Sequence, residues 1–253
     1  VEIGQSKRTE LWELNRAINP NTAGILYFAE SAFLRGSLPL KDIISVAKER
    51  NVPVLVDAAA EIPPVKNLTS YLEMGADLVQ FSGGKEIRGP QSSGFIIGKK
   101  YLIEACALNS NPHAAVGRPF KVDKETIVGL LKAVEIYLQQ DFDEEMKMWA
   151  KQTDYIADQL SQISELGVRV GLGISPGIQP ESIPRTYLTW DEEKINLTKD
   201  EFVNLLKVGN PGIVVSTFPA EGFDINPQML NPGEEVIVVD KIKQIFQQKM
   251  AEG

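Results

Sequence analysis

The chain has 253 residues, of which 43% are hydrophobic and 24% charged, a composition typical of a soluble globular protein. Its 34 acidic and 26 basic residues give a net charge of −8, which argues against a broad nucleic-acid-binding surface, because such surfaces need clustered basic charge. No run approaches the roughly 18 apolar residues of a membrane span, and the single cysteine, Cys106, cannot form an internal disulfide. We therefore expect a cytoplasmic protein with one large domain and a smaller one.

Strands and helices alternate in the first part of the chain. Its apolar runs predict strands at residues 23–29, 52–60, 76–82 and 93–99, and helices at 38–51, 67–75 and 100–109. The first of these helices has Pro39 near its start, and Gly75 is a typical glycine at a helix end. The alternation indicates an α/β domain with a mostly parallel sheet.

The second part of the chain has a different pattern. We expect almost uninterrupted helix from residue 121 to about 166, then strands at 168–173, 183–190 and 212–218, and helices at 198–209 and 232–250. Thr198 is a candidate N-cap, with Glu201 completing a capping box. We therefore divide the chain into a large domain at 1–140 and a linker helix with a small α+β domain at 141–253. Because the chain opens with Val1 and enters a folded pattern almost at once, we expect the large domain to lack an N-terminal part.

Two charged residues stand at the ends of neighbouring predicted strands. Asp57 ends the apolar run VPVLV, where a carboxylate is costly unless it is paired. Lys85 follows the next strand, in the loop QFSGGKEIRGPQSSGF. Ligands of open α/β sheets bind outside the carboxyl ends of the strands, so we expect this acid and this amine in one crevice. Taken singly, such an Asp is more often a helix cap or salt-bridge partner, and such a Lys is usually exposed to solvent.

An amine and a carboxylate in one crevice suit pyridoxal phosphate. This cofactor needs an amine to form a Schiff base with its aldehyde, and a carboxylate to keep its ring nitrogen protonated. It also needs small hydroxylated residues or backbone N–H groups around its phosphate. Ser82, Gly83 and Gly84 are candidates for the phosphate cradle, and Ala59 is small enough to leave a flat place for the ring.

Three stretches are similar to a known family: VDAAAEIPP, GADLVQFSGGKEIRGPQSSGFIIGKKYLI and GRPFKVDKETIVGLLKAVEIYL. They resemble the selenocysteine synthase-like family of fold-type-I pyridoxal-phosphate enzymes, which includes selenium transferases and ammonia-lyases. The resemblance covers most of residues 1–140 and continues more loosely to INPQMLNPGEEVIVVDKI near the C-terminus. It implies the large domain of a fold-type-I transferase, followed by a smaller α+β domain.

The resemblance also implies roles for individual residues. Lys85 matches the Schiff-base lysine, Asp57 the partner of the pyridine nitrogen, and Ser82 a residue near the phosphate. Gln91 and Arg118 match positions close to the active site. Arginine binds a carboxylate or phosphate through its two-pronged guanidinium, so Arg118 is a candidate substrate-binding residue, with a surface ion pair as the alternative.

Three further residues have open interpretations. Arg185, in IPRTYLTW, lies on a predicted strand of the small domain and is a candidate substrate-binding residue. His113, the single histidine, either contacts substrate or is a loop residue without a role. Cys106 lies among apolar residues, which favours a buried structural thiol over a reactive one.

The function predicted from these features is a pyridoxal-phosphate-dependent lyase acting on a small amino acid or amino sugar acid. One alternative is selenium transfer on seryl-tRNA(Sec), which the acidic charge balance disfavours. Another is a non-catalytic fragment or scaffold, because the family's N-terminal glycine-rich phosphate turn is not found in residues 1–22. The resemblance further implies a homo-oligomer with its site at the subunit interface. We expect no metal site.

Overall fold

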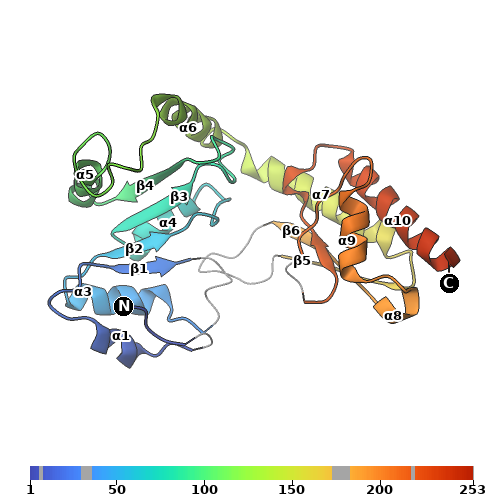
Figure 1. Ribbon diagram of the computed structural model, residues 1–253, viewed down its shortest axis with the longest axis horizontal. Helices are drawn as coiled ribbons and strands as arrows, with labels where there is room; N and C mark the ends of the chain where they lie inside the picture. The colour runs from blue at the N-terminus through green and yellow to red at the C-terminus, as the bar shows by residue number, and fades with distance from the viewer. Residues whose placement is uncertain (6–7, 30–35, 173–182, 218–219, 253) are drawn as a thin grey trace. The chain divides into compact units, whose positions relative to one another are not determined.

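The computed structural model describes residues 1–5, 8–29, 36–172, 183–217 and 220–252 (Figure 1). The described chain divides into two compact units. Unit 1 contains the described residues up to Phe142, and unit 2 contains those from Asp143 onward. No helix in the described ranges is long and apolar enough to cross a membrane.

Unit 1 is built on a four-stranded sheet with the order β1-β2-β3-β4. Its strands are β1 (Ile25–Phe28), β2 (Val54–Asp57), β3 (Leu78–Ser82) and β4 (Gly94–Gly98). Its helices are α1 (Leu11–Ala17), α3 (Leu40–Glu49), α4 (Asn67–Met74), α5 (Lys100–Asn109) and α6 (Lys124–Tyr137). The first three strands are parallel and β4 is antiparallel to β3, which confirms the predicted α/β class with a mostly parallel sheet.

The core of unit 1 lies on one face of the sheet. Side chains alternate between the two faces of a strand, and Tyr27, Val54, Val56, Val79 and Phe81 all point to the buried face. Helix α3 packs against β2, and α4 packs against β3. Helix α4 ends at Gly75, whose φ of 113° is left-handed, as the glycine pattern predicted.

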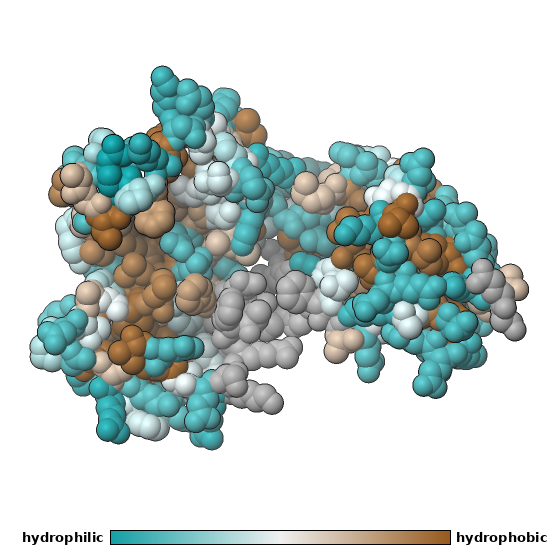
Figure 2. Space-filling view, in the orientation of Figure 1, coloured by the Kyte–Doolittle hydropathy of each residue, from teal (hydrophilic) through white to brown (hydrophobic). Residues whose placement is uncertain are grey.

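The opposite face of the sheet keeps large apolar side chains at the surface. Leu26 and Phe28 of β1 are 56% and 46% exposed, and Ile96 of β4 is 42% exposed. Figure 2 shows hydrophobic residues at the surface of unit 1. This face also carries the side chain of Asp57, because the register places Asp57 beside Phe28 on the neighbouring strand.

At the opposite ends of the strands from Asp57, another buried carboxylate, that of Asp77, connects neighbouring strands. Asp77 Oδ2 accepts the backbone N–H of Val54 at 2.7 Å, and Asp77 Oδ1 lies 2.5 Å from Lys99 Nζ. Asp77 therefore links three successive strand regions of unit 1.

Replacing Asp77 by alanine is expected to lower the free energy of unfolding by about 2 kcal/mol, because the Val54 N–H loses a charged acceptor in a buried place. Urea denaturation of the full chain measures this difference. Lys100→Ala is the matched surface control, since the Lys100 side chain is 90% exposed. An unchanged denaturation midpoint for Asp77→Ala would show that the contact contributes nothing to stability.

Unit 2 contains a three-stranded antiparallel sheet with the order β5-β6-β7. Its strands are β5 (Leu166–Leu172), β6 (Pro184–Trp190) and β7 (Phe223–Ile225). Its helices are α7 (Phe142–Leu160), α8 (Glu192–Ile195), α9 (Lys199–Lys207), the 3-10 turn η1 (Pro227–Met229) and α10 (Glu234–Glu252). Thr198 is the N-cap of α9, as predicted: its Oγ1 accepts the Glu201 N–H at 3.2 Å.

Aromatic rings form the centre of the unit 2 core. Phe202 of α9 lies 5.3 Å from Phe223 of β7 and 6.4 Å from Phe246 of α10, measured between ring centroids. Trp190 at the end of β6 makes edge-on contacts with Phe202 and Phe223 at 5.1 and 5.7 Å. This cluster joins the sheet to both helices, because its members come from β6, α9, β7 and α10.

Three predictions from the sequence are corrected by the structure. The long helix is interrupted between α6 and α7, where the acidic residues Asp143, Glu144 and Glu145 favour a new first turn. The strand predicted at 212–218 is, over its described residues, an isolated bridge from Ser216 to Asp224, and the third strand is β7. Cys106 is only partly buried, because α5 has no buried residue.

Candidate active site

The carboxyl ends of β2 and β3 lie at the same edge of the sheet. These strands are parallel, and Asp57 at the end of β2 is in register with Gln80 of β3. Strand β3 continues to Ser82, and Lys85 follows three residues later. Parallel pairing of two short apolar runs thus places Asp57 and the start of the Lys85 loop at neighbouring strand ends.

The Asp57 side chain is oriented by the turn that follows its own strand. The backbone N–H of Ala59 donates to Asp57 Oδ1 at 3.1 Å. Among the described residues, no other donor bonds this side chain, so Oδ2 is open to a further partner. The carboxylate is half-buried rather than fully exposed. The Asp57 carboxylate is therefore oriented by a hydrogen bond at the end of its strand, and it does not act as a helix cap.

The loop that carries Lys85 is closed by its own backbone. Gly83 N–H donates to the Ser93 carbonyl at 2.9 Å, Gly89 N–H to the Gly83 carbonyl at 2.8 Å, and Arg88 N–H to the Lys85 carbonyl at 2.9 Å. These bonds fold residues 83–93 back on themselves beyond the end of β3. Lys85 lies on the outside of this turn, and its side chain is exposed.

Gly84 permits a close approach to the backbone of Gln91 within the loop. A Cβ on Gly84 would stand 2.6 Å from the Gln91 Cα, a distance that real side chains do not adopt. The N–H groups of Gly84 and Lys85 donate to no other group of the described chain. Two free N–H groups beside an exposed amine form a suitable place for an anion such as a phosphate.

The loop after Asp57 is anchored by two residues that the sequence did not single out. Glu61 accepts the hydroxyl hydrogen bond of Tyr71 at 3.1 Å, and Tyr71 is completely buried. Burial and the nearby Glu61 carboxylate raise the pKa of Tyr71 well above its usual range, so the phenol stays protonated and donates. The signal available in the sequence was an acid and a tyrosine ten residues apart, which is too general to identify such a pair.

Arg118 lies in a compact turn that follows α5. Its Nη1 donates to Asn111 Oδ1 at 2.6 Å, and the adjoining Gly117 N–H donates to the Asn109 carbonyl at 2.7 Å. Arg118 is thus half-buried against an amide, which differs from the surface ion pair considered as its alternative. His113 belongs to the same turn and is exposed. Gln91 is exposed opposite Gly84.

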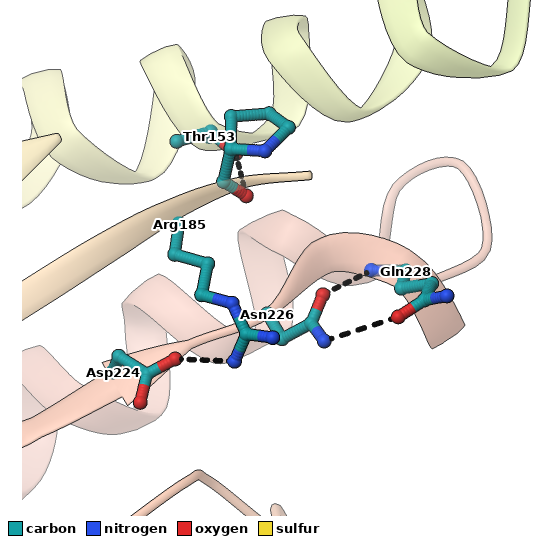
Figure 3. Close-up of polar contacts among 6 residues, drawn as sticks. Thr153, Arg185, Asp224, Asn226 and Gln228 are labelled. Atoms are coloured by element: carbon teal, nitrogen blue, oxygen red, sulfur yellow. Dashed lines mark hydrogen bonds and ion pairs between the residues drawn. The ribbon is translucent and has the colours of Figure 1, made fainter. Parts of the chain in front are cut away.

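Arg185 belongs to unit 2, where it is held by an acid. Its Nη1 lies 2.8 Å from Asp224 Oδ2, in a pair that joins β6 to β7 (Figure 3). Asp224 is completely buried, between Phe223 and Ile225. The sequence did not identify Asp224, because a single acid within a short apolar run gives no pattern.

The residues of unit 1 fit pyridoxal phosphate by their chemistry. Lys85 offers an exposed amine, and Asp57 offers an oriented carboxylate with one open oxygen. The backbone N–H groups of Gly84 and Lys85 adjoin each other, and Gly84 has no side chain to cover them. Ser82 is partly buried at the end of β3, and Ala59 follows Asp57. Within the described ranges, no cluster of His, Cys, Asp or Glu is arranged to hold a metal ion.

Comparisons with known proteins agree with this fold. D-glucosaminate-6-phosphate ammonia lyase of Salmonella typhimurium is 30% identical over 252 residues, which cover 97% of this chain and 63% of the relative. A solved structure of D-glucosaminate-6-phosphate ammonia-lyase is 29% identical with a TM-score of 0.75, and covers 99% of this chain and 64% of that one. 5'-C-glycyluridine monooxygenase-decarboxylase of Streptomyces sp is 29% identical, with coverages of 97% and 60%.

A more distant structure shares the fold alone. Serine palmitoyltransferase from S. paucimobilis, solved with bound PLP, is 14% identical with a TM-score of 0.56, over 95% of this chain and 60% of that one. The chain thus spans 60% to 64% of the length of these relatives. The family model of L-seryl-tRNA selenium transferase matches residues 1–175. The chain therefore belongs to the L-seryl-tRNA selenium transferase family and is a relative of the fold-type-I pyridoxal-phosphate enzymes.

Proposed function

We propose that this chain contributes the catalytic residues of a pyridoxal-phosphate-dependent lyase acting on a small amino acid or amino sugar acid. The observation that carries the proposal is the position of the two residues at the carboxyl ends of adjacent parallel strands: Asp57 is the last residue of β2, and Lys85 follows β3 by three residues. An ammonia lyase that is 30% identical along almost the whole chain supports the reaction class.

When bound, pyridoxal phosphate supplies an aldehyde that reacts with amines and a ring that withdraws electrons from the substrate Cα. Lys85 Nζ would hold it covalently, and Asp57 Oδ2 would keep a proton on its ring nitrogen. Ser82 and the N–H groups of Gly84 and Lys85 would bind its phosphate.

The chain's residues also act on the substrate. Lys85 Nζ would act as the general base that takes the proton from the substrate Cα. The overall reaction that we propose removes a leaving group from the substrate β-carbon and releases ammonia and a keto acid, with water taking the place of the amine at Cα. Gln91, Arg118 and Arg185 are the proposed substrate-binding residues, and the two arginines bind carboxylate or phosphate groups. We further propose a homo-oligomer in the cytoplasm.

The test is to incubate the full chain with pyridoxal phosphate, record its visible spectrum, reduce it with borohydride and map the pyridoxyl adduct by mass spectrometry. We expect an absorbing protein with an adduct confined to Lys85. Lys121→Ala is the matched control, since Lys121 is also exposed, and it should leave the adduct unchanged. A colourless protein without adduct would contradict the proposal and favour the scaffold or fragment alternative.

Selenium transfer on seryl-tRNA(Sec) is the second candidate, because the family model that matches residues 1–175 has that description. The net charge of −8 disfavours it, since tRNA binding needs clustered basic residues. A gel-shift measurement with serylated tRNA separates the two candidates. Tight binding would reverse their order.

A further inference from the structure

The loop that carries Lys85 contains one residue in a strained backbone conformation. Arg88 has a φ of 56°, in the left-handed region that residues other than glycine rarely adopt. Its N–H donates to the Lys85 carbonyl at 2.9 Å, so this left-handed residue closes the turn that begins at Lys85. Backbone strain of this kind persists only where the surrounding structure maintains it. Residues outside the turn therefore have to hold its shape.

Helix α6 packs against this loop through small residues. In Figure 1, α6 lies next to the connection between β3 and β4. A Cβ on Gly129 of α6 would stand 3.0 Å from Pro90 Cγ and 3.6 Å from Pro90 Cδ. A Cβ on Gly89 would stand 3.1 Å from Ala133 Cβ. Gly129 and Ala133 are one turn apart and share a face of α6, so this face holds the two residues that follow Arg88.

The glycine at position 129 is unfavourable for the helix itself. Glycine is the poorest helix former after proline, because it loses the most backbone freedom on folding. Gly129 lies in the interior of α6, which runs from Lys124 to Tyr137, and its backbone is one that any residue can adopt. Among the described residues, Pro90 is the contact that a side chain at this position would crowd. The packing of the loop therefore explains the glycine, and the helix does not.

We propose that Gly129 is a positioning residue for Lys85, because it lets α6 support Pro90 and so fixes the loop that carries the Lys85 amine. The ring of Pro90 restricts its backbone, so a displaced ring moves the chain with it. Gly89, the next residue, donates its N–H to the Gly83 carbonyl at 2.8 Å, which transmits the displacement to both sides of Lys85. The inference rests on the proposed function in one respect: Lys85 is taken to be the residue that reacts with pyridoxal phosphate.

Two variants of Gly129 test this support by degree. Gly129→Ala adds one methyl group and improves the helix propensity of α6, so its urea midpoint should be no lower than that of the parent chain. Gly129→Val adds a larger group and should displace the loop further. Lys132→Val is the matched control, because Lys132 is 68% exposed in the same helix and receives the same β-branched side chain.

Hydrogen–deuterium exchange of the full chain without cofactor reports directly on the loop at 83–93. The Arg88 amide is protected by its bond to the Lys85 carbonyl, and displacement of the loop weakens that bond. We expect exchange at this amide to accelerate by about threefold in Gly129→Ala and by at least about tenfold in Gly129→Val. Exchange in Lys132→Val should stay within about twofold of the parent value.

The rate at which Lys85 forms a borohydride-stable adduct with pyridoxal phosphate reports on the position of its amine. We expect the rate constant to fall by about threefold in Gly129→Ala and about tenfold in Gly129→Val, because small displacements of a reacting group slow its reaction. Pro90→Ala removes the ring atoms that face position 129. The rate constant of Gly129→Val combined with Pro90→Ala should therefore lie within about twofold of that of Pro90→Ala alone. A general loss of stability would not be rescued in this way.

The outcomes separate this inference from the proposed function. Unchanged loop exchange in the Gly129 variants would overturn the inference, and so would a double variant that stays as slow as Gly129→Val. If Gly129→Val does not fold, Gly129→Ala decides alone through its exchange and its adduct rate. A parent chain that forms no adduct at Lys85 would contradict the proposed function, while the exchange measurement would still decide whether Gly129 holds the loop.

Discussion

Replacing Lys85 by arginine is expected to remove the pyridoxyl adduct and to lower ammonia release from the substrate by at least about a thousandfold. Arginine keeps the positive charge and most of the length of the side chain. It cannot form a Schiff base or accept a proton near neutral pH, because its pKa is too high. Both roles proposed for Lys85 Nζ are therefore lost while the surface charge is retained.

The substitution should not disturb the fold, because the Lys85 side chain is exposed and its turn is closed by backbone hydrogen bonds. The folded stability of Lys85→Arg should equal that of the parent within about 0.5 kcal/mol. Lys121→Arg serves as the control. Ammonia release at the parent rate from Lys85→Arg would show that another amine performs the chemistry.

Replacing Asp57 by asparagine is expected to retain the adduct at Lys85 but to lower kcat by about a hundredfold. Asparagine has nearly the same shape, and its Oδ1 can still accept the Ala59 N–H bond of 3.1 Å. It has no negative charge, so it cannot keep a proton on the ring nitrogen, and stabilisation of negative charge at the substrate Cα is lost.

Asp77→Asn is the informative comparison, because Asp77 is a carboxylate of the same sheet that contacts β2 at its other end. It should reduce stability and leave kcat unchanged. The adduct is measured after borohydride reduction and kcat from ammonia release. Loss of the adduct together with kcat in Asp57→Asn would indicate that Asp57 is needed to bind the cofactor rather than to activate it.

The main elements of unit 1 could be predicted from sequence because their signals are local. The apolar run VLV predicted β2, and Gly75 predicted the end of α4. In unit 2, the N-cap residue Thr198 likewise predicted the start of α9. The strand β7 could not be predicted, since it is only three residues long and contains Asp224. Its strand state comes from pairing with β6, which is a non-local contact.

Some residues of the candidate site could likewise be predicted from the sequence, and others could not. Asp57 and Lys85 could be found because they interrupt strong patterns, an apolar strand and a glycine-rich loop. Asp224 and the Glu61–Tyr71 pair could not, because their roles depend on which buried neighbour each meets after folding. Those partners are 39 and 10 residues away in the chain, and no short pattern encodes them. The two domain ranges and the site roles stay predictions.

The aromatic core of unit 2 gives the protein an intrinsic optical probe. Of its three tryptophans, Trp149 is 0% exposed and Trp190 is bonded through Nε1 to the Leu197 carbonyl at 2.7 Å, both in unit 2. Trp12, in unit 1, is 61% exposed, so we expect its emission to change little on unfolding. A red shift of the fluorescence during denaturation therefore reports on unit 2, and the loosening of one unit can be followed without a label.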